Sequence, residues 1–284
     1  MMLRHPSPTL SRAAALTDLV REAAPIPERL DGSLRRALAY RLSASAPARE
    51  HGSVRLDGWT VEQALLPVMN SQDAFVWSPR TSRRLLGLAA ARRVLTGTSP
   101  NPMAGVLAEI DAIALRATTQ DLRPGSLGAW LTEAPRGVLG AIVAEATTYA
   151  TDVVTLLDWD RLETPTAVGA ADPVWAVPGA PWVSLRGRRD IEITLDADAG
   201  TRALICLRAG RPSEASMEDL SLVALASGLT KPDAPLPTRI VGVWPTAGRS
   251  VSLEISAHDI RRSARRLVDA ASALRQETAH ATAA

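Results

Sequence analysis

The chain of 284 residues contains little lysine, cysteine and histidine, and each shortage excludes a kind of chemistry. Lys231 is the only lysine, so the other 31 of the 32 Lys and Arg residues are arginine, and any catalytic lysine would have to be Lys231. Cys206 is the only cysteine, which excludes an internal disulfide and a zinc site built from several cysteines. The histidines are too scattered to predict a metal or acid–base site: His5, His51, His258 and His280.

Long apolar runs and a strong net charge are also missing. No stretch approaches the roughly 18 uninterrupted apolar residues of a membrane span. The N-terminal segment, MMLRHPSPTLSRAAALTDLV, lacks the apolar run and the cleavage site of a signal peptide. The formal net charge of +2 does not by itself indicate a nucleic-acid partner. Together with the single cysteine, these features predict a soluble cytoplasmic protein without a membrane partner.

The first half of the chain is predicted to be mainly helical. Apolar residues recur there at helical spacing, and Ser78 followed by Pro79 is typical of a helix start. The expected helices cover residues 10–22, 27–42, 61–68, 81–95, 102–116 and 138–157.

From residue 174 onward the pattern changes to short strands. Ile191, Ile193 and Leu195 alternate with polar residues, as in a half-buried strand, whereas residues 203–207 are continuously apolar, as in a central strand. Strands are predicted at 174–177, 182–185, 190–195, 203–207, 239–244 and 251–255, and helices at 213–229 and 258–276. We expect the strands at 182–185, 190–195 and 203–207 to form a meander in one sheet.

The order of these elements predicts an α/β (α+β) fold, with a mixed β-sheet flanked by helices and preceded by a helical N-terminal region. We place the helical region at 1–134, the α/β core at 135–276 and a disordered tail at 277–284. The repeated βαβ units of a doubly wound nucleotide-binding fold are absent. So are the motifs GxGxxG, GxxxxGK and HExxH, which excludes the sites that they mark.

The second half of the chain contains a series of motifs in a definite order. Residues 187–190, Gly-Arg-Arg-Asp, lead into a strand, and residues 204–212 comprise an apolar strand together with the glycine that follows it, Gly210. A helix at about 217–226 and a strand at 239–244 come next, and Arg136-Gly137 begins the helix upstream. Over about residues 136–274 the chain is thereby similar to the RecB-like branch of the PD-(D/E)XK nucleases. The resemblance implies a restriction-endonuclease-like fold.

The resemblance also assigns roles in a nuclease site. Such enzymes hold a divalent cation, usually Mg²⁺, with two or three carboxylates, and place a lysine beside it. Asp190 matches one metal ligand, whereas Cys206 stands at the position of the second acid and Arg208 at that of the lysine. A thiol is a poor ligand for magnesium, and a guanidinium lacks the compact geometry of an ammonium group. The other carboxylates that could take part are Glu192, on the same strand face as Asp190, and Glu145, on the preceding helix.

The arginines around Asp190 form a second set of candidates. Because arginine binds phosphate bidentately, the expected nucleic-acid contacts are Arg186, Arg188, Arg189, Arg208 and Arg211. Alternatively, these arginines lie on a solvent-exposed turn and neutralise nearby acids. In that case Asp190 and Glu192 lie on a solvent-exposed strand face and form ion pairs with Arg186 or Arg208.

Three functions fit these residues. The first is a catalytically inactive nuclease-like protein that needs no cofactor and binds DNA or the protein subunits of a DNA-processing or defence assembly. The second is an active Mg²⁺-dependent deoxyribonuclease with a non-standard site of Asp190, Glu192 and Arg208. The third is a scaffold subunit that binds only protein. The departures at Cys206 and Arg208 favour the first.

Overall fold

The computed structural model describes residues 8–22, 29–47, 49–65, 76–119, 125–162 and 166–283. The chain divides into two compact units. A helical unit comprises Met1–Leu19 and Gln72–Glu163, and a mixed unit comprises Val20–Ser71 and Thr164–Ala284. This division differs from the expected boundary at residue 135, because α7 (Arg136–Val154) packs against α4 (Pro79–Leu95) and so belongs to the helical unit.

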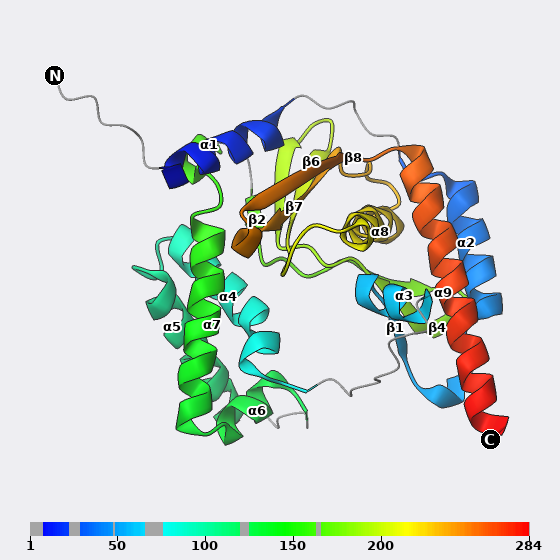
Figure 1. Ribbon diagram of the computed structural model, residues 1–284, viewed down its shortest axis with the longest axis horizontal. Coiled ribbons are helices and arrows are strands. Elements are labelled where there is room, and N and C mark those ends of the chain that lie inside the picture. Colours follow the sequence, from blue (N-terminus) through cyan, green and yellow to red (C-terminus); the bar gives the residue numbers. More distant parts are fainter. Residues whose placement is uncertain are drawn as a thin grey trace. The chain divides into compact units, whose positions relative to one another are not determined.

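The helical unit is built around α4, α5 (Pro102–Thr119) and α7, which lie side by side (Figure 1). The short α6 (Leu127–Glu133) packs on α5, and α1 (Pro8–Arg21) begins in this unit. A Cβ at Gly87 would lie 2.9 Å from the Cβ of Tyr149, so glycine permits the close approach of α4 and α7. The predicted start of α4 is confirmed, because the Ser78 side chain accepts a hydrogen bond from the Thr81 N–H in a capping box.

The mixed unit contains two sheets. In the three-stranded sheet the order is β1-β4-β3, with β1 (Val54–Leu56) parallel to β4 (Ala180–Arg186) and β3 (Val174–Val177) antiparallel to it. In the five-stranded sheet the order is β2-β5-β6-β7-β8, and only the β6–β7 pair is parallel. Its strands are β2 (Thr166–Val168), β5 (Ile191–Asp196), β6 (Thr201–Leu207), β7 (Arg239–Trp244) and β8 (Arg249–Glu254). The expected mixed α/β class is therefore confirmed.

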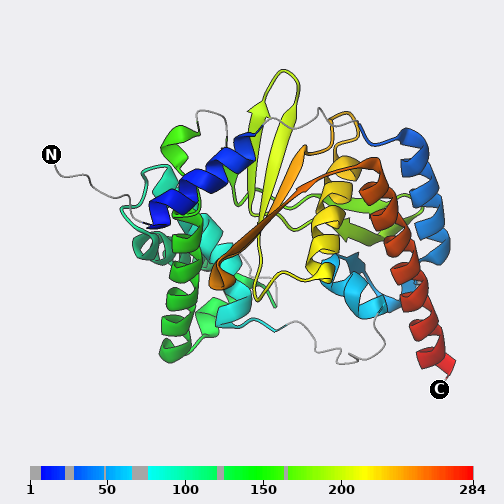
Figure 2. The same cartoon turned by 45° about the horizontal axis from the view of Figure 1, so that its top comes forward.

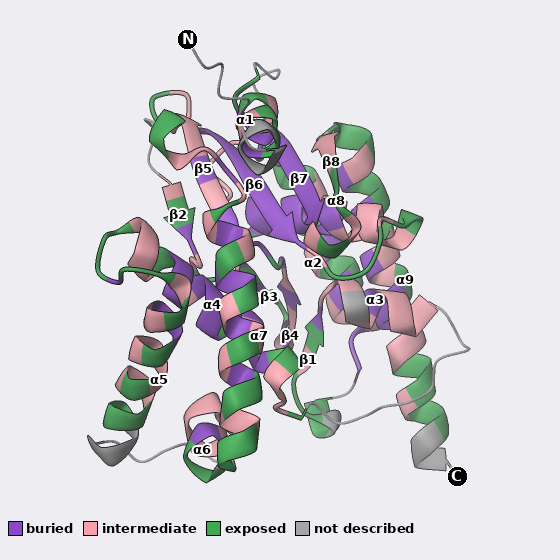
Figure 3. Cartoon of the chain, turned by 60° about the vertical axis from the view of Figure 1, so that its left-hand side comes forward, coloured by how far each residue is buried: buried purple, intermediate pink, exposed green. Residues whose placement is uncertain are grey.

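Helix α8 (Glu214–Thr230) connects the parallel strands β6 and β7 and forms the centre of the mixed unit (Figure 2). It contacts β7 in one sheet and β3 and β4 in the other, and its second half is buried on all sides. This half of α8 has no exposed polar face, as expected for a helix inside a core. The helices α3 (Gly58–Leu65) and α9 (Ala257–Ala283) pack on α8, and α2 (Gly32–Ser45) packs on α9. Strands β6 and β7 are buried along their whole length (Figure 3).

The expected meander is wrong in one strand. β4, predicted to lie next to β5, belongs to the other sheet, and β2 occupies the free edge of β5. A turn with Gly179 at φ +86° folds β4 back on β3, which fixes its partner. Gly187 then passes close to α8, where an added Cβ would lie 2.8 Å from the Cβ of Ala226, and leads the chain from one sheet to the other.

Helix α9 continues to Ala283, through most of the segment at 277–284 that was expected to be a disordered tail. The segment after residue 276 is rich in alanine, which favours helix. Within it the Thr278 hydroxyl donates to the carbonyl oxygen of Leu274 at 3.1 Å. Within the described ranges, none of the helices combines the length and the apolar character that a membrane span requires.

Candidate functional site

Three of the predicted site residues, Asp190, Arg208 and Arg211, lie where the parallel strands β6 and β7 end and α8 begins. Because both strands run in the same direction, the loop after β6 and the loop after β7 emerge at one edge of the sheet. Asp190 comes to the same edge, since its N–H donates to the carbonyl oxygen of Ile205 near the end of β6. Ligands of open α/β sheets bind at the carboxyl ends of the strands, so this edge is the place to look for function.

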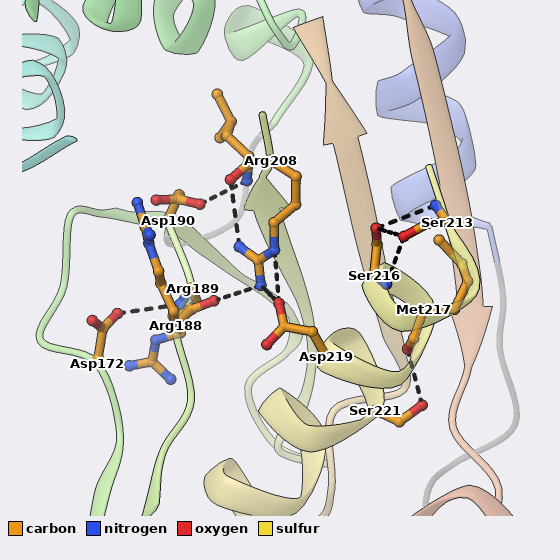
Figure 4. A network of polar contacts seen from close by, with 11 residues as sticks. Asp172, Arg188, Arg189, Asp190, Arg208, Ser213, Ser216, Met217, Asp219 and Ser221 are labelled. Carbon is orange, nitrogen blue, oxygen red and sulfur yellow. Dashed lines mark hydrogen bonds and ion pairs between the residues drawn. The ribbon is translucent and has the colours of Figure 1, made fainter. Parts of the chain in front are cut away.

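Asp190 is buried, and its carboxylate holds the end of β6. One carboxylate oxygen accepts a hydrogen bond from the N–H of Leu207 at 2.6 Å, and the residue is only 1% exposed (Figure 4). A carboxylate that accepts from a buried backbone N–H keeps that donor satisfied. Asp190 therefore contributes to the fold itself.

Arg208 joins three segments of the chain. Its Nε and Nη2 lie 2.9 Å and 2.6 Å from one carboxylate oxygen of Asp219 on α8, and it also donates to the carbonyl oxygens of Arg188 and Leu207 (Figure 4). Burial alone would lower the pKa of Arg208, but the acidic groups of Cys206, Asp219 and Asp190 together raise this pKa above its ordinary value. The guanidinium is a permanent cation that fastens the end of β6 to the turn before β5 and to α8.

Glu192 lies among three cations. Its carboxylate oxygens are 2.7 Å from Arg189, 3.3 Å from Arg202 and 3.8 Å from Lys231, the only lysine of the chain. Burial raises the pKa of Glu192, but Arg189, Lys231 and Arg202 outweigh it and bring this pKa below its ordinary value. The expected ion pairs of Glu192 with Arg186 or Arg208 are wrong, because the strand face that carries Glu192 lies against buried arginines.

These residues do not fit a magnesium ion. Of the two carboxylates on the strand, Asp190 is bound to a backbone N–H, and Glu192 is surrounded by cations. Cys206 is fully buried, and Glu145 lies on α7 in the helical unit, where it pairs with Arg83 at 3.2 Å. Among the described residues, no three acidic, histidine or cysteine side chains are grouped as a metal site would require.

Most of the arginines expected to contact phosphate have internal partners instead. Arg186 lies 2.6 Å from Asp172, whose other oxygen accepts from the Arg189 N–H at 3.1 Å. Arg189 and Arg208 pair with Glu192 and Asp219, as described above. Only Arg188 and Arg211 of the predicted set are exposed. The acidic partners Asp172 and Asp219 were not identified from the sequence, since nothing in their spacing relates them to these arginines.

An open depression lies at the same edge of the sheet. Its lining comes from the loops after β6 and β7 and from the first residue of β8: Gly210, Arg211, Pro212, Thr246, Ala247 and Arg249. Neither Arg211 nor Arg249 forms an ion pair or side-chain hydrogen bond with another residue that the structure describes. The sequence analysis did not identify Arg249 as a site residue. The parallel pairing of β6 and β7 could have indicated it, because this pairing places the loops after both strands at one edge of the sheet.

Comparisons of the chain with family models, with curated proteins and with solved structures give no match.

Proposed function

We propose that this protein is a catalytically inactive relative of the RecB-like PD-(D/E)XK nucleases and that it binds DNA through backbone phosphates. The observation that carries the proposal is that Asp190, Glu192 and Arg208, the charged residues of the candidate site in the mixed unit, all have partners within the protein. Asp190 holds the Leu207 N–H, Glu192 pairs with three cations, and Arg208 pairs with Asp219.

The order of elements supports the relationship. A strand entered through Gly187-x-x-Asp190 pairs antiparallel with the apolar strand β6, and α8 then leads to the parallel strand β7. This is the order that the resemblance implies, with the three-stranded sheet as an addition in this chain. The fold assignment itself stays part of the proposal.

The charge arrangement supports binding over catalysis. To bind a metal, Glu192 would have to leave Arg189 and Arg202, which are themselves buried. That change would leave buried charges without their partner, which costs more than the about 1–3 kcal/mol of an unpaired neutral group. Contact with phosphate needs no such rearrangement, because it uses exposed arginines such as Arg211.

The proposal is tested by incubating the purified protein with plasmid DNA and 5 mM Mg²⁺ or Mn²⁺, and by titrating a labelled duplex at two salt concentrations. We expect no cleavage, and binding that weakens as salt rises. Cleavage that is lost in Asp190→Asn but kept in the control Asp198→Asn, a change at an exposed turn, would instead establish an active nuclease. Absence of DNA binding even at low salt would favour a subunit that binds only protein.

A further inference from the structure

The depression at the ends of β6 and β7 lies at the edge where open α/β sheets bind their ligands. It is open to solvent and has a volume of about 690 Å³. All of its lining residues belong to the mixed unit. The loops on its two sides turn at Gly210, with φ +76°, and at Gly248, with φ +63°.

The charge of the lining is entirely positive. Arg211 and Arg249 contribute guanidinium groups, and the six lining residues include no carboxylate. Within the described ranges, both side chains are exposed and have no ion-pair partner, in contrast to Arg208, which is held by Asp219. An anion can therefore bind between them without breaking a contact within the protein, and two guanidinium groups favour phosphate.

The lining lacks the side chains that distinguish bases. It includes no aromatic residue on which a base could stack and no Asn or Gln that could bind an adenine edge. The two arginines could contact guanine only if their geometry were fixed, and no described residue anchors their guanidinium groups. Such a surface contacts the sugar–phosphate backbone of DNA and does not distinguish one base sequence from another.

From these observations we infer that the depression binds adjacent backbone phosphates of DNA through Arg211 and Arg249, without preference for base sequence. This inference rests on the proposed function, and it assigns the proposed DNA contact to one site on the protein. The phosphate contact is thereby assigned to Arg211 and to Arg249, the first residue of β8. The arginines Arg186, Arg189 and Arg208, which were expected to make it, have acidic partners instead.

The test compares the wild type with the double variant Arg211→Gln/Arg249→Gln. The probe is a fluorescein-labelled 20-base-pair DNA duplex, and its anisotropy is followed between 50 and 200 mM NaCl. The matched control is Arg41→Gln/Arg55→Gln, which removes the same charge at exposed positions of the mixed unit outside the depression. Each phosphate contact contributes about 0.9 to the slope of log K against log salt, so the double variant should lose about 1.8 of that slope.

The expected result is at least a tenfold rise in Kd at 50 mM NaCl for Arg211→Gln/Arg249→Gln and a smaller rise for the control. Arg211→Lys/Arg249→Lys keeps both charges and should retain most of the slope. A second duplex of the same composition but permuted sequence should bind within twofold of the first.

Three outcomes would overturn the inference. If the wild type binds and the depression variant matches the control, the site is elsewhere while DNA binding stands. A tenfold difference between the two duplexes would refute independence of sequence. If the wild type fails to bind at 50 mM, the proposed function fails, and the inference fails with it.

Discussion

Two groups of arginines on and around the strands β5 to β8 differ in their surroundings. The charge cluster consists of Arg189, Asp190, Glu192, Arg202, Arg208 and Asp219, and its arginines pair with carboxylates. In the depression, Arg211 and Arg249 have no such partner among the described residues. Arg208 and Arg211 are only three positions apart, so the density of arginine in a sequence does not tell which ones bind ligand.

The difference follows from burial. Arg189 and Arg202 are 7% and 5% exposed, and a charge that leaves water needs a partner of opposite sign and hydrogen bonds. Arg211 and Arg249 are exposed, so water satisfies them until a ligand replaces it. The comparison predicts that substitutions in the charge cluster change the stability of the fold, and that substitutions in the depression change binding alone.

The largest expected effect is that of Glu192→Gln. The variant leaves Arg189 and Arg202 buried without their carboxylate, which should lower the free energy of unfolding by about 3 kcal/mol in urea at pH 7. The control Asp18→Asn removes a carboxylate from an ion pair with Arg161 in which both side chains are exposed, and it should cost less than about 1 kcal/mol. A loss of equal size in both variants would contradict the importance of burial.

The stability difference between wild type and Glu192→Gln should also depend on pH. Arg189, Lys231 and Arg202 lower the pKa of Glu192 in the folded protein despite its burial. The wild type is therefore the more stable protein above the ordinary glutamate pKa of about 4.3. This advantage decreases as the pH falls through the lower pKa of the folded state. The measurement is the free energy of unfolding of both proteins in urea between pH 3 and 7. A difference between them that stays constant over this range would show that the Glu192 carboxylate is not ionised in the folded protein.

Arg208→Gln should have the next largest effect, about 2 kcal/mol, because it removes charge-assisted hydrogen bonds to Asp219. In a double-mutant cycle with Asp219→Asn, the coupling free energy should exceed about 1 kcal/mol. The salt dependence of DNA binding should stay that of the wild type. A shallower salt slope for Arg208→Gln would place this residue in contact with phosphate and remove the distinction between the two groups.

Ser213→Ala should cost about 1 kcal/mol, since the Ser213 side chain caps α8 by accepting from the Ser216 N–H. Ser213 also ends the loop that carries Arg211, but it brings no charge, so the salt slope of binding should not change. Ser221→Ala is the control within the same helix, because its hydroxyl only donates to the Met217 carbonyl oxygen at 3.4 Å (Figure 4). Equal losses of stability would contradict the capping role.

The local elements of this fold were largely predictable from the sequence. The strands at 174–177 and 239–244 agree with β3 and β7, and the helix at 213–229 agrees with α8 within one residue at each end. Hydrophobic periodicity was sufficient here because each element buries a defined face or a continuous apolar run. β1 and β2 were missed, since strands of three residues are too short to show alternation.

The pairing of elements and of charges was not predictable in the same way. Alternation shows which face of a strand is buried but not which strand lies beside it, so β4 was placed next to β5 when it pairs with β1 and β3. The partners of Glu192 depend on the path of α8, whose end brings Lys231 to β5. Asp190 was singled out as a metal ligand, and the sequence did not show that its carboxylate would accept a hydrogen bond from the Leu207 N–H.

The smallest expected effect on stability is that of Arg211→Gln/Arg249→Gln. Neither side chain contacts another described residue through a hydrogen bond or ion pair, and exposed substitutions of this kind change stability by less than about 0.5 kcal/mol. Urea unfolding should therefore coincide with that of the wild type, although the same variant is expected to lose most of its DNA affinity. If Arg211 and Arg249 serve only to bind ligand, the protein keeps its fold when they are replaced. Arg208→Gln should do the opposite: it should destabilise the fold and leave the salt dependence of DNA binding unchanged. If the depression variant lost as much stability as Arg208→Gln, its arginines would belong to the fold, and the contrast between the two groups would not hold.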